Sequence, residues 1–168
     1  RLRHELDTGD ILLQARLPIA PEDNVGKVHD ALMYLGAETL VKTVDLFLQD
    51  EEPQAQAQSS YDIAPTSAPK LTKENTELRW TSTAQELHNQ VRGLSPYPAA
   101  WATLQFPGQE PAVFKILATE LGEPLAPTEA SPIGSLHLVG KAGVEIQTAS
   151  GRLRILTLQP AGKKAMPA

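Results

Sequence analysis

Leu6-Asp7-Thr8-Gly9-Asp10 stands near the start of the chain, just before the apolar run Ile11-Leu12-Leu13. Glycine permits the backbone conformations that a tight bend needs, and aspartate side chains bond the amides of such turns. Two interpretations are therefore open. In one, Asp7 and Asp10 only shape a turn between two strands. In the other, the turn presents the Asp7 carboxylate for chemistry.

The composition suits one modest domain or two small ones, because 41% of the 168 residues are hydrophobic and 5% are aromatic. The chain has no cysteine, so it can form neither a disulfide framework nor a thiolate metal site. No apolar run approaches the length that spans a bilayer, and we expect no membrane partner. The chain begins at Arg1 without a methionine, and we expect a fragment whose true N-terminus is missing.

The net charge of -5 is unevenly distributed. Residues 1–69 carry five Lys and Arg against twelve Asp and Glu, whereas residues 70–168 carry ten against eight. The acidic first part does not look like a nucleic-acid surface. The mildly basic second part permits a polyanionic partner without demanding one.

Residues 1–49 have the pattern of the end of an α/β domain. The segment 11–19 reads as a strand that is covered on both faces, because its apolar start does not alternate with polar residues. Pro21-Glu22-Asp23-Asn24 supplies the chemistry of a helix start. Apolar spacing then predicts one helix that Gly36 stops and a second one that carries Leu40 and Phe47 on its face. A strand followed by helices suits the closing section of an open α/β sheet.

The remainder changes character twice. Residues 50–69 lack apolar periodicity and read as an extended linker, with Tyr61 as an anchor on a neighbouring domain. Thr83-Ala84-Gln85-Glu86 is a capping-box pattern that starts a helix, which Gly93 and Pro96 end. A loop is expected at 119–132. Short strands are expected between turn signals at 102–106, 112–118, 134–139, 144–148 and 153–158, which predicts a small antiparallel barrel.

Three stretches of the sequence stand out together. They are His4-Glu5-Leu6-Asp7-Thr8-Gly9-Asp10-Ile11-Leu12, Arg92-Gly93-Leu94-Ser95-Pro96-Tyr97-Pro98-Ala99-Ala100-Trp101 and Leu158-Gln159-Pro160-Ala161-Gly162-Lys163-Lys164-Ala165-Met166. All three resemble segments of the methionyl-tRNA formyltransferase family. The first is shared by many folate-dependent formyltransferases, but the three in this order are typical of the tRNA enzymes. The resemblance covers essentially the whole chain. It implies the last strand and helices of a Rossmann-like catalytic domain at 1–49, an interdomain linker at 50–69, and an OB-like antiparallel β-barrel at 70–168.

The resemblance also implies an activity. The family transfers a formyl group from 10-formyltetrahydrofolate to the amine of methionyl-initiator-tRNA in translation initiation. Amine attack on a formyl group makes an oxyanion and a cationic nitrogen, so one must be stabilised and the other deprotonated. Asp7 falls on the aspartate of the family's catalytic Asn, His and Asp. The family's Asn and His lie upstream of Arg1, and we therefore expect this chain alone to be inactive.

The resemblance extends to binding residues. Leu6, Thr8 and Gly9 would line the pterin pocket through main-chain groups, although they could equally only shape the turn. Candidate tRNA phosphate contacts are Lys70, Lys73, Arg92, Lys163 and Lys164. Ordinary solvated lysines, and a closing turn of the barrel at 159–162, explain the same residues without RNA.

Other polar and aromatic residues receive plainer interpretations. The four histidines, His4, His29, His88 and His137, do not match the family's catalytic histidine, and packing or exposure explains them. Trp80 and Trp101 are expected to pack rather than to stack on bases. No spacing of His and carboxylate residues suits a metal, so the folate is the only cofactor expected.

Two rival functions stay open. A formyltransferase that acts on a sugar amine, or a formyltetrahydrofolate hydrolase relative, shares the Leu6–Gly9 turn and can share the barrel. Alternatively, residues 70–168 form a stand-alone RNA-binding module. For the leading hypothesis we expect a monomer in the bacterial cytoplasm, or in an organelle.

Overall fold

The computed structural model describes residues 4–51, 53–122, 131–139 and 143–168. They separate into two compact units, one made of the residues up to Ala20 with Lys27–Lys70 and the other of Pro21–Gly26 with Leu71–Ala168. The segment expected to be a linker, 50–69, thus groups with the first unit. Within the described ranges, no helix is both long and apolar enough to cross a membrane.

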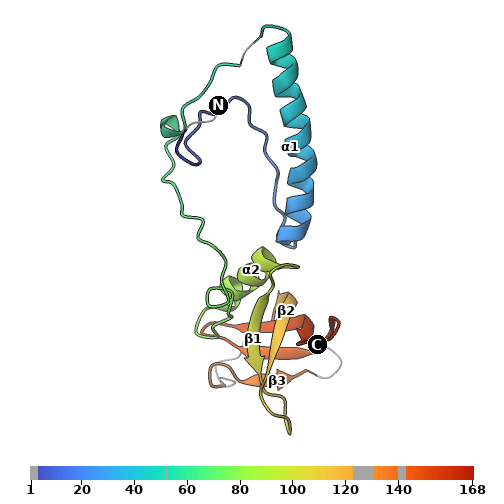
Figure 1. Ribbon diagram of the computed structural model, residues 1–168. Helices are drawn as coiled ribbons and strands as arrows, with labels where there is room; N and C mark the ends of the chain where they lie inside the picture. Colours follow the sequence, from blue (N-terminus) through green and yellow to red (C-terminus); the bar gives the residue numbers. More distant parts are fainter. Residues whose placement is uncertain (1–3, 52, 123–130, 140–142) are drawn as a thin grey trace. The chain divides into compact units, whose positions relative to one another are not determined.

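The first unit contains one long helix, α1 (Val25–Leu48) (Figure 1). The prediction of two helices separated at Gly36 is wrong, because Gly36 lies inside α1. A single glycine weakens a helix by only about 1 kcal/mol, and the residues on either side continue the helical pattern. None of the α1 side chains is buried. Leu32 and Leu40 are 48% and 65% exposed.

The predicted strand at 11–19 is not formed. Ile11 makes an isolated antiparallel bridge with Gln56, through two backbone hydrogen bonds of 2.8 Å, and the rest of the segment is irregular. A strand requires a neighbour that satisfies its backbone groups along its length, and the described residues supply one only at Gln56. The described residues therefore do not show the Rossmann-like part of the expected fold.

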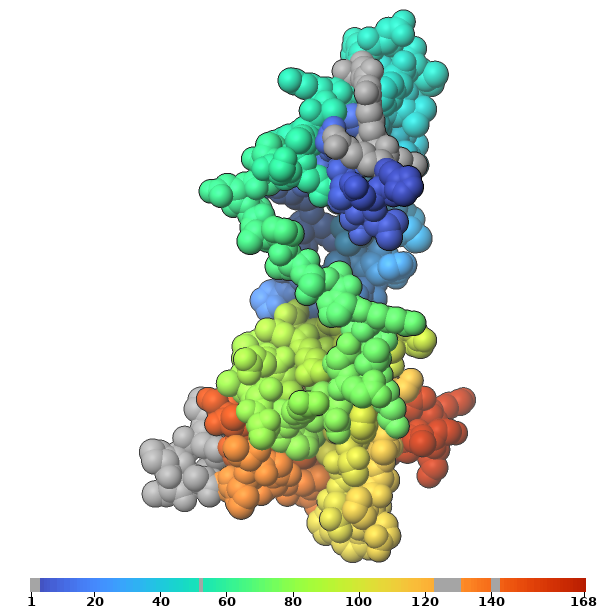
Figure 2. Space-filling model, turned by 60° about the vertical axis from the view of Figure 1, so that its left-hand side comes forward, coloured from blue at the N-terminus to red at the C-terminus, as the bar shows by residue number. Residues whose placement is uncertain are grey.

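The segment expected to be a structureless linker has local order at its centre. It contains a short 3-10 helix, η1 (Gln58–Ser60). The Tyr61 hydroxyl donates to Gln56 Oε1 at 2.9 Å, so the polar contact of Tyr61 lies within the segment rather than on another domain. After η1 the chain runs to Lys70 as a narrow, exposed thread (Figure 2).

The second unit is an antiparallel sheet in the order β1-β2-β5-β4-β3, with β6 paired to β5 (Figure 1). The strands are β1 (Ala100–Leu104), β2 (Ala112–Leu121), β3 (Leu136–Leu138), β4 (Val144–Gln147), β5 (Arg152–Pro160) and β6 (Met166–Pro167). The sheet confirms the expectation of a small antiparallel, barrel-like domain. The loop expected at 119–132 is wrong at its start, since β2 continues to Leu121; residues 123–130 lie outside the described residues.

The helix α2 (Ala84–Leu94) covers the sheet and begins with the predicted capping box. Thr83 N donates to Glu86 Oε2 at 2.8 Å, and Glu86 N donates to Thr83 Oγ1 at 3.2 Å. The Thr83 amide, followed by the Thr83 hydroxyl, which donates to Glu86 Oε2 at 2.9 Å, lowers the pKa of the Glu86 carboxyl. The helix ends at Leu94, between Gly93 and Pro96, which were expected to mark its end.

The core lies between α2 and the sheet. Leu87 and Val91 of α2 are each 1% exposed, and they belong to one buried cluster with residues of the central strands. The strand members with the least exposure are Ala100, Ile116, Ile146, Leu153 and Ile155. Beyond α2 the chain turns into β1 through two cis peptide bonds, Ser95–Pro96 and Tyr97–Pro98.

A charged group is buried beside this core. Glu145 on β4 is 4% exposed, and its Oε1 accepts from Arg154 Nε at 2.9 Å and Nη2 at 2.7 Å. Arg154 also donates to Glu120 Oε1 at 2.7 Å, so the ion pairs run across β2, β5 and β4. Glu145 Oε2 also lies 3.7 Å from Arg152 Nη1. Removing Arg154 would leave the buried Glu145 with this longer contact alone, which is destabilising.

The core assignment predicts a contrast between two adjacent residues of β5. Ile155 is fully buried and Leu156 is 39% exposed. Ile155→Ala should lower the free energy of unfolding by about 2–5 kcal/mol, through lost burial and the cavity that remains. Leu156→Ala should lower it by less than about 1.5 kcal/mol. Urea unfolding measures both, and equal losses would contradict the assignment of faces.

His88 on α2 predicts a pH dependence of stability. The residue is 6% exposed, and its Nδ1 lies 3.0 Å from Thr119 Oγ1. Burial, followed by repulsion from Arg92, lowers the pKa of His88, while Glu22 opposes this shift. A lowered pKa in the folded state means that the unfolded chain takes up a proton first as the pH falls.

The stabilisation from neutral His88 is therefore complete above the ordinary histidine pKa of about 6.5 and is lost as the pH falls toward the lower value of the folded state. We expect a lower melting temperature at pH 5.5 than at pH 7.5 and a weaker pH dependence in His88→Gln. The control His29→Gln changes an exposed histidine and should leave the pH dependence as it is. An unchanged slope in His88→Gln would refute this origin.

Candidate functional site: a clamped turn beside a pocket

The Leu6–Asp10 turn has an unusual backbone at Asp7, whose φ is 59°. This left-handed conformation is uncommon for residues other than glycine, although Asp tolerates it better than most. Thr8 Oγ1 donates to the Glu5 carbonyl at 3.0 Å and closes the turn locally. The turn is therefore a defined local structure even without flanking strands.

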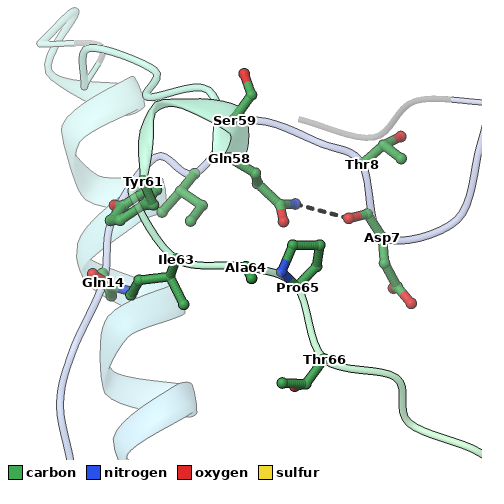
Figure 3. A pocket seen from close by; sticks show the side chains of 11 residues that line it. Asp7, Thr8, Gln14, Gln58, Ser59, Tyr61, Ile63, Ala64, Pro65 and Thr66 are labelled. Atoms are coloured by element: carbon green, nitrogen blue, oxygen red, sulfur yellow. Dashed lines mark hydrogen bonds between the residues drawn. The ribbon is translucent and has the colours of Figure 1, made fainter.

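Gln58 holds the same turn from far along the chain. Its Nε2 donates to the carbonyl oxygens of Asp7 at 2.9 Å and of Gly9 at 2.8 Å. Figure 3 shows the first of these bonds and also shows the Asp7 carboxylate pointing away from it. We call these two hydrogen bonds the Gln58 clamp. The clamp engages the main chain and leaves the carboxylate out of the contact.

The turn and the clamp border a pocket of about 800 Å³ (Figure 3). Its walls combine apolar side chains with amide and hydroxyl groups, contributed by Asp7, Thr8, Ile11, Gln14, Gln58, Ser59, Tyr61, Ile63, Ala64, Pro65 and Thr66. Apolar walls with a few placed polar groups are typical of sites for small organic ligands, and the volume lies in their range. The pocket can therefore accept a flat heterocycle beside the Asp7 carboxylate.

The predicted catalytic residue, Asp7, lines the pocket together with Thr8 of the predicted folate-binding set. Gly9 of that set contributes its carbonyl to the clamp. Leu6 does not line it and is 91% exposed. Among the residues that line this pocket there is no histidine. Within the described chain, no three His, Cys, Asp or Glu side chains gather as a metal site would require.

The predicted tRNA contacts other than Lys70, which ends the first unit, lie on the second unit in different settings. Lys73 Nζ lies 5.3 Å from the ring centre of Trp101, and Trp101 Nε1 donates to the Lys73 carbonyl at 2.8 Å. On the sheet, Trp101 of β1 pairs with Lys115 of β2, which pairs with Gln159 of β5. Trp101 thus stands in a row across three strands, next to a second lysine.

Arg92 is engaged within the protein. Its Nη1 donates to the Asp23 carbonyl at 2.7 Å and its Nη2 to Asn89 Oδ1 at 2.9 Å. Backbone from the segment before α1 is thereby bonded to the end of α2, and the Gly26 amide adds a bond to the Ser95 carbonyl at 3.1 Å. The geometry gives Arg92 a structural role in the second unit.

Lys163 and Lys164 are exposed on the turn between β5 and β6. Gln159 Nε2 donates to the Lys163 carbonyl at 2.7 Å, and the Lys163 amide donates to the Pro160 carbonyl at 3.1 Å. Gly162 has φ 70°, a value that favours glycine. The closing-turn interpretation of 159–162 therefore fits the structure, and both lysines are exposed on this turn. Lys70 is also exposed.

Two residues at these sites were not named from the sequence. Gln58 sits in a Gln- and Ala-rich stretch without periodicity, so the chain alone gives no signal for its contact with residue 7. Lys115 could have been found, because the alternation of β2 places it on the face opposite the buried Ile116. Trp80 packs against the core as expected.

The fold and the turn together define a class of protein. The family model for the formyl transferase C-terminal domain matches residues 70–168, the stretch that forms α2 and the sheet. The chain therefore belongs to the formyl transferase C-terminal domain family.

Two similar proteins bear the same name. The chain is similar to a protein of Porphyromonas gingivalis named methionyl-tRNA formyltransferase, at 42% identity over 100% of this chain and 52% of the relative. A protein of the same name from Bacteroides thetaiotaomicron is 39% identical over 98% of this chain and 51% of the relative. The chain thus spans about half the length of the curated relatives that it matches.

Solved structures share the fold at low identity. HypX from Aquifex aeolicus matches with a TM-score of 0.68 and 15% identity, over 98% of this chain and 28% of that protein. A structure of HypX in complex with tetrahydrofolic acid matches with a TM-score of 0.67. At this identity the likeness establishes the fold alone.

The contacts of Arg92 predict that its substitution destabilises the protein more than substitution of an exposed lysine does. Arg92→Ala should lower the free energy of unfolding by about 1–3 kcal/mol, because it removes hydrogen bonds of a charged donor to Asp23 and Asn89. Lys163→Ala removes an exposed side chain and should change it by less than about 0.5 kcal/mol. Chemical denaturation compares the two variants, and equal stability would argue against the structural role of Arg92.

Proposed function

We propose that this chain is part of a methionyl-tRNA formyltransferase, which transfers a formyl group from 10-formyltetrahydrofolate to the amino group of methionyl-initiator-tRNA. The observation that carries the proposal is the fixed turn that presents Asp7 at a pocket, in a chain whose relatives of 39% and 42% identity bear that name. The family match at 70–168 supports the same assignment. A transferase of this kind acts in translation initiation.

Asp7 is the proposed catalytic residue of this chain. When bound, 10-formyltetrahydrofolate supplies the activated formyl carbon, and the pocket beside Asp7 has a size and lining that suit such a ligand. Attack by an amine leaves a cationic nitrogen, so a base must take up a proton. Asp7 assists this proton transfer through its carboxylate, while Thr8 and Gly9 keep the turn in place. The catalytic Asn and His are contributed from outside this chain.

The second unit is proposed as the tRNA-binding part. Lys70, Lys73, Lys163 and Lys164 are exposed basic residues of its surface or approach, and cationic side chains bind phosphates with little sequence preference. Lys115, beside Trp101, extends the set across the sheet. Arg92 is a less suitable phosphate ligand, because its guanidinium already bonds Asp23 and Asn89.

The proposal includes an organisation of the chain. Residues 1–49 are the end of a Rossmann-like catalytic domain, 50–69 the interdomain linker and 70–168 the OB-like domain. The exposed apolar residues of α1, such as Leu40 and Leu48 at 65% and 77%, then face the remainder of that catalytic domain. The protein is proposed to be a cytoplasmic monomer that needs no metal.

Asp7→Asn tests the proposal in the full-length protein. The amide keeps the shape of the side chain and removes its basicity, so kcat for formylation of methionyl-tRNA should fall about 100- to 10,000-fold. The melting temperature should stay unchanged. Asp10→Asn, in the same turn, is the matched control and should retain most of the activity. Acid-gel separation of formylated from unformylated methionyl-tRNA measures the rates.

Three results would contradict the assignment. Full activity in Asp7→Asn would remove its catalytic role. A wild-type protein that formylates a nucleotide-sugar amine but not methionyl-tRNA would change the acceptor. A wild-type protein that binds RNA without any formyl transfer would make it a binding module.

A further inference from the structure

The Gln58 clamp has a consequence for the chemistry of the turn. We propose that Gln58 is a positioning residue for Asp7: its side-chain amide fixes the backbone of the Leu6–Asp10 turn and so keeps the Asp7 carboxylate in place at the pocket. The inference rests on the proposed function for the role of Asp7. It goes beyond that function, because it makes the linker segment part of the catalytic machinery.

The match of donors to acceptors supports the role. A primary amide offers two N–H groups, and the turn directs two carbonyl oxygens at it, from Asp7 at 2.9 Å and Gly9 at 2.8 Å. Both acceptors flank Thr8, so the two bonds fix the orientation of the segment that follows the Asp7 side chain. A single bond would leave the turn able to rotate about it.

The backbone of Asp7 supplies independent support. Its φ of 59° is a conformation that persists in non-glycine residues only where the surroundings hold it, and such positions cluster at functional sites. The Thr8 hydroxyl bond to the Glu5 carbonyl acts on one side of the turn. The Gln58 clamp adds a long-range restraint on the turn itself.

Gln58 is itself held in position. It is the first residue of η1, and the Ser60 hydroxyl bonds back to the Ala57 carbonyl at 2.7 Å. Just before it, Gln56 pairs with Ile11 through both backbone groups. Tyr61 bonds the Gln56 side chain from the other side. A side chain supported in this way is suited to orient another residue, because its own conformation is already restricted.

The clamp acts through the main chain, not on the reacting atoms. The Asp7 carboxylate points away from the Gln58 amide (Figure 3). Gln58 therefore neither takes part in a proton transfer by this carboxylate nor blocks access to it. Its loss should displace the carboxylate while leaving its chemistry intact. A misplacement of about 1 Å can lower a rate about 100-fold.

The test uses Gln58→Met in the full-length protein, since methionine keeps the length of the side chain and removes both donors. Gln54→Met is the matched control, because Gln54 is an exposed glutamine of the same segment with no bond to the turn among the described residues. We expect Gln58→Met to lower kcat for methionyl-tRNA formylation by about 10- to 100-fold. The KM of Gln58→Met for methionyl-tRNA and its melting temperature should stay at wild-type values. The activity of Gln54→Met should stay at the wild-type value as well.

A double-mutant cycle separates positioning from a general structural role. If Gln58 acts through Asp7, adding Gln58→Met to Asp7→Asn should cause no further fall in kcat. If Gln58→Met lowers kcat by the same factor in the Asp7→Asn background, the proposal is overturned. Wild-type kcat in Gln58→Met would overturn it as well.

Failure of the proposed function is recognised separately, because the wild-type protein would then not formylate methionyl-tRNA. In that case amide hydrogen exchange of residues 6–10 tests the clamp directly. Exchange at least about 10-fold faster in Gln58→Met than in Gln54→Met would support the clamp. Equal exchange in the two variants would overturn it.

Discussion

The register of β5 is the constraint on which the second unit depends. β5 pairs with β2, β4 and β6, and at its centre Leu153 and Ile155 enter the core while Arg154 and Leu156 face the other way. A slip by one residue would reverse the faces. It would place the Arg154 guanidinium in the core and leave Glu145 buried without a partner. Hydrophobic burial and charge compensation therefore select the same alignment, and the fold of the sheet follows from it.

The second unit could be predicted from the sequence because its signals are local. A capping box at Thr83 and Glu86 begins α2, and Gly and Pro clusters separate strands whose alternation indicates their faces. The bounds of the strands move by a few residues, most clearly at Leu121, because pairing with β5 extends β2 beyond its own pattern. In the first unit the described residues supply few partners. The apolar segment at 11–19 has strand propensity but only Gln56 to pair with, and Gly36 is too weak a signal to end α1.

The candidate site likewise has parts that the sequence predicts and parts that it does not. The proposed role of Asp7 follows from the resemblance of its stretch to a family motif, and the structure adds the pocket beside it. Local rules account for the turn at 159–162, where Gly162 supplies the required backbone. The partner of the Asp7 turn could not be found in this way. Gln58 lies about 50 residues away in a stretch with no periodicity. Its contact with the turn forms only when the chain folds back. The Trp101–Lys115–Gln159 row likewise requires the strand register before its members become neighbours.

Trp101 gives the sheet surface a natural optical label. Its indole N–H is bonded to the Lys73 carbonyl and the Lys73 ammonium lies over its ring, so the excited state of the indole experiences a nearby positive charge. A polyanion that draws Lys73 toward itself alters that local field. The emission of Trp101 then reports contact at this surface without any attached dye. Trp80, packed against the core, serves as the internal reference in the same spectrum.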